Sequence, residues 1–235
     1  MHFDKAYVIG FEQTGAKRLE RFFQHANKAG VEVELFPAVN GREVDTLEFK
    51  TQGYLGEEFE LRMPGSLGCL LSHVTLWDKI AADSHNEIIL VCEDDALLNR
   101  KFRDQLAAIP WSEVPDDWDV IRLASHKVTG DTVSKHFVRP PTRYLRGRNS
   151  GTFCYLLKAS SALKIKSVLL PYDNKQSIDV LLKKRSDQYN LYISKKPLAR
   201  ELRFRYSPRV DLNTSGKPHK GFKQFLIRIS KRFLR

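Results

Sequence analysis

Residues 5–36 read KAYVIGFEQTGAKRLERFFQHANKAGVEVELF, and this stretch decides the fold class. A short apolar run at its start is typical of a strand, and the alternating run at 31–36 is typical of a second one. Between them, apolar residues recur at helical spacing before a closing glycine. They are Leu19, Phe22, Phe23 and Ala26, followed by Gly30. A strand, a helix and a strand over about thirty residues form a βαβ unit, which predicts a parallel sheet and an α/β protein.

The rest of the chain continues this alternation. Residues 37–65 lack a clear period and predict mostly loop with one short helix. Helices are expected at 66–80, 100–109, 159–170 and 177–186, strands at 86–91, 117–123, 151–158 and 191–194, and a polar loop at 125–149. The sequence contains no repeat or low-complexity segment. We therefore expect one domain over residues 1–210 and a separate tail over residues 211–235.

Length and composition fit an ordinary globular domain. The chain has 235 residues, of which 42% are hydrophobic, which is enough to build a core. It contains no run of about 20 apolar residues that would span a membrane, and its start lacks the order of a signal peptide, so we expect a cytoplasmic location. Cys69, Cys92 and Cys154 are widely spaced in apolar surroundings. This pattern predicts buried thiols rather than a disulfide framework or a zinc site.

The positive charge is concentrated at the C-terminus. Residues 195–235 hold 13 Lys and Arg against two acids, which accounts for the whole net charge of +11 and leaves 26 residues of each sign before them. Residues 221–235 predict a basic amphipathic helix with an apolar face. Its apolar residues are Phe222, Phe225, Leu226, Ile229 and Phe233. We expect this tail to bind an anionic membrane surface. The alternative is a helix that packs on the domain's own core.

Three adjacent acids follow the strand in IILVCEDDALL, residues 88–98. Ligands of parallel α/β sheets collect at the carboxyl ends of strands, where Glu93, Asp94 and Asp95 lie. If the segment is extended, Glu93 and Asp95 share a side and Asp94 faces the other way. Such a pair of carboxylates suits a hard divalent cation, Mg²⁺ or Mn²⁺, with a diphosphate as a further ligand. The alternatives are a solvated acidic turn, or Asp95 as a helix cap.

Six motifs occur in an order that resembles glycosyltransferase family 25, which includes bacterial lipooligosaccharide galactosyltransferases and relatives that glycosylate collagen. The motifs are FPAVNGREVD at 36–45, GSLGCLLSHVTLW at 65–77, LVCEDDALL at 90–98, DWDVIRL at 117–123, GTFCYLL at 151–157 and SIDVLL at 177–182. The resemblance covers roughly residues 5–185. Gly10 stands where the family usually carries asparagine, which removes a side-chain contact to the nucleotide there.

The resemblance implies a GT-A type fold, with a Rossmann-like, mixed and mainly parallel sheet flanked by helices. It also implies a nucleotide-sugar donor and a divalent metal, Mn²⁺ or Mg²⁺, bound by Glu93 and Asp95. The residues expected near the donor are Gly10, Phe11, Lys17, Ser72, His73, Glu93 and Asp94. For Lys17 and its neighbour Arg18 the alternative is an exposed helix charge, which we favour for Arg18. For His73 the alternative is a hydrogen-bonded structural histidine.

Asp179 matches a family aspartate and is the candidate general base of an inverting transfer. Its alternative role is a first-turn acid that complements the helix dipole. Related architectures draw a further metal ligand from near the C-terminus, where Asp211 and His219 are available, and nothing local selects between these two.

The expected function is transfer of a hexose, galactose from UDP-galactose, to a lipooligosaccharide core acceptor on the inner face of the cytoplasmic membrane. Three alternatives remain open: a UDP-glucose-dependent transferase of the same pathway, a metal-dependent nucleotidyltransferase, and a nucleic-acid-binding protein with a basic tail. The balanced charge of residues 1–194 and the lack of a recognisable nucleic-acid module count against the last one.

Overall fold

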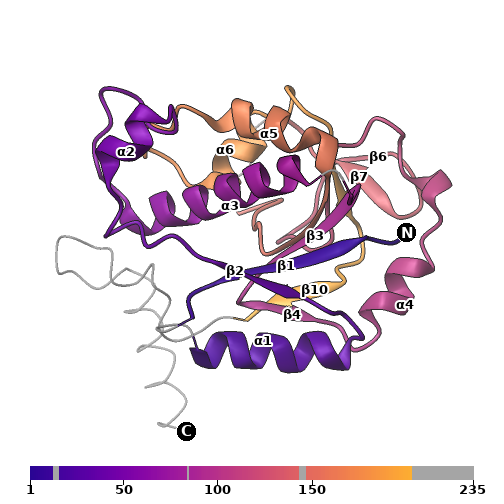
Figure 1. Ribbon diagram of the computed structural model, residues 1–235. Helices are drawn as coiled ribbons and strands as arrows, with labels where there is room; N and C mark the ends of the chain where they lie inside the picture. Colours follow the sequence, from indigo (N-terminus) through magenta and orange to yellow (C-terminus); the bar gives the residue numbers. More distant parts are fainter. Residues whose placement is uncertain (13–15, 84, 143–146, 203–235) are drawn as a thin grey trace, which may run out of the picture.

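The computed structural model describes residues 1–12, 16–83, 85–142 and 147–202 (Figure 1). A central sheet of eight strands has the order β2-β1-β3-β8-β5-β9-β7-β6. The strands are β1 (Lys5–Gly10), β2 (Glu34–Pro37), β3 (Ile88–Glu93), β5 (Val120–Arg122), β6 (Asp131–Thr132), β7 (Phe137–Arg139), β8 (Cys154–Lys158) and β9 (Leu191–Ser194). A separate antiparallel pair joins β4 (Ala96–Leu98) to β10 (Ala199–Glu201).

The sheet is mixed and mainly parallel. Strands β2, β1 and β3 run the same way, β8 is antiparallel to β3 and β5, and β9 is again parallel to β5. Strand β7 is antiparallel to β9, and β6 is antiparallel to β7, so β6 again runs in the direction of β1. Only β8 and β7 therefore oppose the other six strands in this sheet. The expected α/β class and sheet type are confirmed.

Helices cover both faces of the sheet. They are α1 (Ala16–Lys28), α2 (Thr46–Thr51), α3 (Pro64–Ala82), α4 (Phe102–Ala107), α5 (Ala162–Leu169) and α6 (Ile178–Lys184), with short 3₁₀ helices at Trp111–Glu113 and Ala159–Ser161. Figure 1 shows α1 and α4 on one side of the sheet and α3, α5 and α6 on the other. No described helix combines the length and the apolar content needed to cross a bilayer.

Strand alternation divides the core into two clusters. In β1, Ala6 and Val8 pack with the α1 side, whereas Tyr7 and Ile9 pack with the α3 side. The central strand β3 divides in the same way and is buried on both faces, which is why its sequence is a continuous apolar run. That arrangement brings the carboxyl ends of β1 and β3 to one edge, next to the acidic residues.

Several expected boundaries differ from the observed ones. The helix expected from Ser66 begins at Pro64 instead, because proline fits the first turn of a helix, and no side chain caps it. The one short helix expected within 37–65 is α2, capped by Asp45, which accepts from the backbone N–H groups of Leu47 and Glu48. The polar loop expected at 125–149 contains the hairpin of β6 and β7. The tail, with Asp211 and His219, lies outside the described residues.

Asp119 is a buried carboxylate that joins three segments of the fold. It accepts hydrogen bonds from Ser161 Oγ at 2.5 Å, from Lys164 Nζ at 2.5 Å and from the backbone N–H of Asn190 at 2.8 Å. Burial alone would raise the pKa of Asp119, but these hydrogen bonds outweigh it and hold the pKa below its usual value. Asp119 therefore stabilises the fold in its ionised form.

We predict that Asp119→Asn lowers the free energy of unfolding by about 1–3 kcal/mol at pH 7, because the amide turns a donor toward buried donors. The folded-state pKa is the lower one, so the contribution of Asp119 is complete above the unfolded pKa of about 4 and disappears as the pH falls through the folded-state value. Urea denaturation between pH 7 and pH 3 measures this difference. Asp116→Asn, at an exposed position, is the control, and an equal loss in both variants would contradict the prediction.

Candidate functional site

A cavity of about 380 Å³ lies at the carboxyl ends of β1 and β3. Its walls come from the end of β1, the first turn of α1, the loop at 38–42, the start of α3, the acidic triplet and the segment 150–153. Asp179 of α6 and Glu201 of β10 complete the lining. The cavity therefore gathers residues that are widely separated in the sequence.

Most of the predicted site residues line this cavity. They are Gly10, Phe11, Ser72, His73, Glu93, Asp94, Asp95 and Asp179. Lys17 is the exception, since it lies exposed on α1 and does not line the cavity. Its neighbour Arg18, which the sequence favoured as an exposed helix charge, is instead mostly buried in the cavity wall. One step along a helix turns a side chain by about 100°, so only one of these two neighbours faces the site.

The acidic triplet does not have the extended geometry that the sequence predicts. Asp94 and Asp95 form a turn between β3 and β4, and both carboxylates face Arg18. Arg18 Nη2 forms an ion pair with Asp94 and lies 3.2 Å from Asp95 Oδ2. Glu93 points elsewhere and accepts a hydrogen bond from Thr152 Oγ1 at 2.5 Å. The turn brings all three acids into one cavity, since a bend removes the alternation of a strand.

One arginine does not neutralise this concentration of carboxylates. Burial raises the pKa of Asp94 to about 6; Arg18 opposes the rise and Glu93 adds to it. Burial and the charge of Glu93 raise the pKa of Asp95 to about 8. Asp95 Oδ1 is also buried without a hydrogen-bond partner among the described residues. Excess negative charge and an orphaned oxygen fit a hard divalent cation, which takes carboxylate ligands.

Gly10 is needed for close packing rather than for a side-chain contact. A Cβ atom at this position would lie 2.6 Å from Leu19 Cδ2 and 3.1 Å from the Cβ of Asp94. The absence of a side chain therefore lets α1 approach the acidic turn. This packing places Arg18 beside Asp94.

The loop at 38–42 is held against α3 by backbone contacts. A Cβ on Gly41 would lie 1.9 Å from Pro64 O, and a Cβ on Gly68 would lie 2.5 Å from Val39 O. Ser72 Oγ accepts from the Val39 N–H at 2.8 Å and donates to Gly68 O at 2.7 Å. Ser72 was predicted to lie near the donor. It does line the cavity, but its hydroxyl is used to fix the wall.

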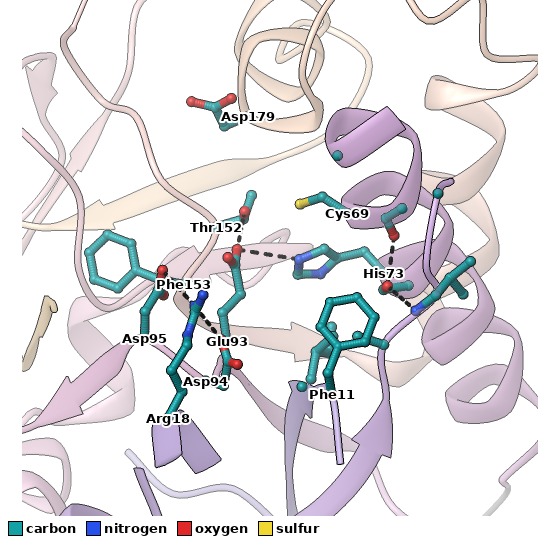
Figure 2. A pocket seen from close by; sticks show the side chains of 18 of the residues that line it. Phe11, Arg18, Cys69, His73, Glu93, Asp94, Asp95, Thr152, Phe153 and Asp179 are labelled. Atoms are coloured by element: carbon teal, nitrogen blue, oxygen red, sulfur yellow. Dashed lines mark hydrogen bonds and ion pairs between the residues drawn. The ribbon is translucent and has the colours of Figure 1, made fainter. Parts of the chain in front are cut away.

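His73 lies at the base of the cavity and is 1% exposed. Its Nδ1 lies 2.9 Å from Tyr155 Oη, which also accepts from Trp77 Nε1 at 2.9 Å. Its Nε2 lies 3.4 Å from Glu93 Oε1 (Figure 2). His73 is thus a hydrogen-bonded core histidine, the alternative weighed from the sequence, and it also borders the acidic residues. Its place near the donor stays a prediction.

Asp179 lies apart from the triplet, on the opposite side of the cavity (Figure 2). It stands in the first turn of α6, where Ser177 Oγ donates to its Oδ1 at 2.5 Å. A carboxylate at this place fits both roles weighed from the sequence, the general base and the helix-dipole partner.

Glu201 and His126 are site residues that sequence reasoning missed. Glu201 Oε2 lies 3.0 Å from His126 Nε2, and both residues line the cavity. The pairing of β10 with β4 brings Glu201 to the acidic turn, where the backbone N–H of Leu202 donates to Asp95 O at 2.7 Å. No local pattern marks the short segment around Glu201, so only the tertiary pairing reveals it.

We predict that Gly68→Ala lowers the free energy of unfolding by about 1–3 kcal/mol, because the added Cβ meets backbone atoms that cannot yield. Gly56→Ala is the matched control, since a Cβ there meets no heavy atom within 4 Å. Its expected effect is between neutral and a gain of about 1 kcal/mol. Urea denaturation of both variants measures the difference, and equal stabilities would contradict the close approach of the loop to α3.

Comparison with known proteins adds the family. Residues 3–182 match the model of glycosyltransferase family 25, described as an LPS biosynthesis protein. A glycosyltransferase 25 family member from Aedes aegypti is 29% identical over 172 residues, which cover 68% of this chain and 27% of the relative. Procollagen galactosyltransferase 1 from Danio rerio is 25% identical over 175 residues, covering 70% of this chain and 28% of its own length.

Some of the matching relatives are named as inactive or probably inactive. The inactive glycosyltransferase 25 family member 3 from Mus musculus is 24% identical over 211 residues, covering 82% of this chain and 34% of its own length. The chain thus spans about a quarter to a third of the length of these three relatives.

The fold also resembles a solved structure of a Drosophila β1,4-galactosyltransferase 7 mutant in complex with manganese, UDP-Gal and xylobiose. The match covers 94% of this chain and 78% of that chain. Its sequence identity is 12% and its TM-score is 0.43, too low to carry an argument about the site. The family match rests on sequence and includes every predicted site residue from Gly10 to Asp179. Since it spans most of the chain, the protein belongs to glycosyltransferase family 25.

Proposed function

We propose that this protein is an inverting glycosyltransferase that uses a hard divalent cation and a UDP-sugar donor. The observation that carries the proposal is the cavity itself, with a buried acidic cluster on one wall and a single carboxylate, Asp179, on the other. Transfer from a nucleoside diphosphate needs positive charge at the leaving group and a base near the acceptor. The two walls fit these two needs.

The acidic wall fits the diphosphate end of the donor. The sequence paired Glu93 with Asp95 as metal ligands. Because the turn places Asp94 beside Asp95, we assign these two aspartates to the cation, with Glu93 as a third carboxylate beside them. When bound, the cation supplies Lewis-acid stabilisation of the charge that develops on the departing phosphate. Arg18 keeps the two aspartates in the turn through its ion pairs, and Phe11 offers a ring to the nucleotide base at the end of β1.

Asp179 fits the acceptor end. An inverting transfer needs the acceptor hydroxyl to attack the face of the sugar opposite the leaving group, so the base must lie across the site from the diphosphate. The position of Asp179 across the cavity from the acidic triplet supports this role. The hydrogen bond from Ser177 occupies only one of its oxygens. Its Oδ2 would take the proton of the attacking hydroxyl.

The donor sugar and the acceptor are inferred from the family. The family description names LPS biosynthesis, and the Danio rerio relative is named a galactosyltransferase. We therefore favour galactose from UDP-galactose as the donor group and a lipooligosaccharide core as the acceptor. A glycolipid acceptor lies in a membrane, so we propose that the basic segment 221–235 attaches the protein to the inner face of the cytoplasmic membrane.

The central test is stabilisation by UDP. At 100 times its dissociation constant, a ligand adds about 2.7 kcal/mol to the stability of the folded protein. We predict a clear rise in Tm when UDP and Mn²⁺ are added together, and little or none with UDP in EDTA. Stabilisation by other nucleotides but not by UDP would favour a nucleotidyltransferase. Mass spectrometry of products from a panel of UDP-sugars and truncated glycolipids then identifies the sugar.

Asp179→Asn tests the base. We predict that kcat falls by about 10²- to 10⁴-fold, because the amide cannot accept the hydroxyl proton, while UDP affinity in the presence of Mn²⁺ stays the same. The matched control is Asp173→Asn, at an exposed position close in sequence. Turnover near the normal rate in the Asp179 variant would remove this residue from the mechanism.

A further inference from the structure

Cys69, His73 and Glu93 form a cluster of which the proposed transfer uses only Glu93. Cys69 and His73 lie four residues apart on α3 and so share one face of the helix, and Glu93 reaches them from the end of β3. One ligand atom from each residue lies within 4.8 Å of the other two. The sequence predicted a buried structural thiol at position 69. In the structure Cys69 is only partly buried and lines the cavity, unlike Cys92 and Cys154.

The distance between His73 and Glu93 suits a shared metal ion better than a hydrogen bond. His73 Nε2 is buried and has no hydrogen-bond partner among the described residues, and Glu93 Oε1 is 3.4 Å away. Hydrogen bonds to nitrogen donors are typically about 2.7–3.2 Å. A tetrahedral zinc ion, with bonds of about 2.0–2.2 Å to nitrogen and oxygen, places two such ligands about 3.3–3.5 Å apart. The observed distance falls in this range.

The groups around the cluster already hold two of its members in place. Histidine ligands usually have their second ring nitrogen fixed by a hydrogen bond. Here the Nδ1 of His73 is fixed by Tyr155, whose position is in turn set by Trp77. Thr152 orients the carboxylate of Glu93. The Nε2 of His73 is therefore directed at Glu93 before any ion binds.

We propose that Cys69, His73 and Glu93 bind a borderline-soft divalent cation such as Zn²⁺, with a water molecule as the fourth ligand. A sulfur and a nitrogen ligand favour zinc over magnesium or manganese, whereas Asp94 and Asp95 offer only oxygen. As the metal–sulfur bond forms, the Cys69 thiol proton passes to the buffer. The residues that favour zinc and the residues that favour a hard cation therefore lie in neighbouring parts of one cavity.

Glu93 borders both the zinc site and the hard-cation site. Zinc binding would therefore regulate the transferase, an inference that rests on the proposed function. Zinc would hold Glu93 on the side of His73 and place a second positive charge beside the hard-cation site. Zinc binding should therefore weaken the binding of Mn²⁺.

Cobalt(II) is the direct probe, because its spectrum reports both geometry and sulfur ligation. We expect the full-length, metal-free protein with one equivalent of Co²⁺ to give visible bands of a tetrahedral ion and a near-ultraviolet sulfur-to-cobalt band. Zn²⁺ should remove both sets of bands, while Mg²⁺ should not. This measurement needs neither donor nor turnover, so failure of the zinc site and failure of the proposed transferase can be told apart.

Variants assign the ligands. Cys69→Ser should abolish the sulfur-to-cobalt band and weaken Zn²⁺ binding, measured by calorimetry, by more than the roughly 10- to 100-fold typical of a lost outer hydrogen bond. His73→Gln should lose the tetrahedral bands. His85→Gln is its matched control, since the side chain of His85 is 90% exposed. If His73→Gln does not fold, Cys69→Ser decides the matter alone. No sulfur-to-cobalt band in the wild type, or an unchanged band in Cys69→Ser, would overturn the proposal.

Discussion

The contact of Arg18 with Asp94 and Asp95 is the interaction on which the site depends. It joins the first turn of α1 to the turn that ends β3, and so connects two elements that are adjacent in space but some 75 residues apart in sequence. Without the guanidinium, the carboxylates of Asp94 and Asp95 would lie together in the turn without this ion pair, at a high cost in free energy. One guanidinium faces two carboxylates, so the pairing stabilises the turn and still leaves carboxylate oxygens for the cation that we propose.

The fold class and much of the site follow from local sequence. The βαβ unit, the apolar run of β3 and the acids at its end are visible as patterns, because strand alternation and helical spacing act over short distances. Arg18, Glu201 and the direction of Asp94 are different, because each depends on a contact between distant segments. The sequence favoured an exposed Arg18 because an arginine early in a helix is ordinarily solvated. The absence of a side chain at Gly10 lets Leu19 of α1 pack close to the end of β1, and Arg18 lies next to Leu19 on the same helix.

The two sides of the cavity are built in different ways. The side formed by β1, β3 and α1 uses charge, and its geometry follows from a bend between two strands. The side formed by the loop at 38–42 and α3 uses backbone contact, with Ser72 as the pin between them. His73 sits where the two meet, tied to the core through Tyr155 and facing Glu93. A site with one charged side and one rigid side suits a ligand whose ends differ in polarity, as those of a nucleotide sugar do.

The close contact between Gly41 and Gly68 fixes the shape of one cavity wall through backbone atoms. The loop approaches α3 through main-chain atoms, and within the loop Asn40 Oδ1 accepts a hydrogen bond from the Arg42 N–H at 3.1 Å. Arg42 lines the cavity and is exposed. Exchanging the Arg42 side chain would change the polar groups that line the cavity, while the contact of the Gly41 backbone with α3 remains. Under the proposed function, position 42 is therefore a place where selectivity for the sugar would change without rebuilding the loop.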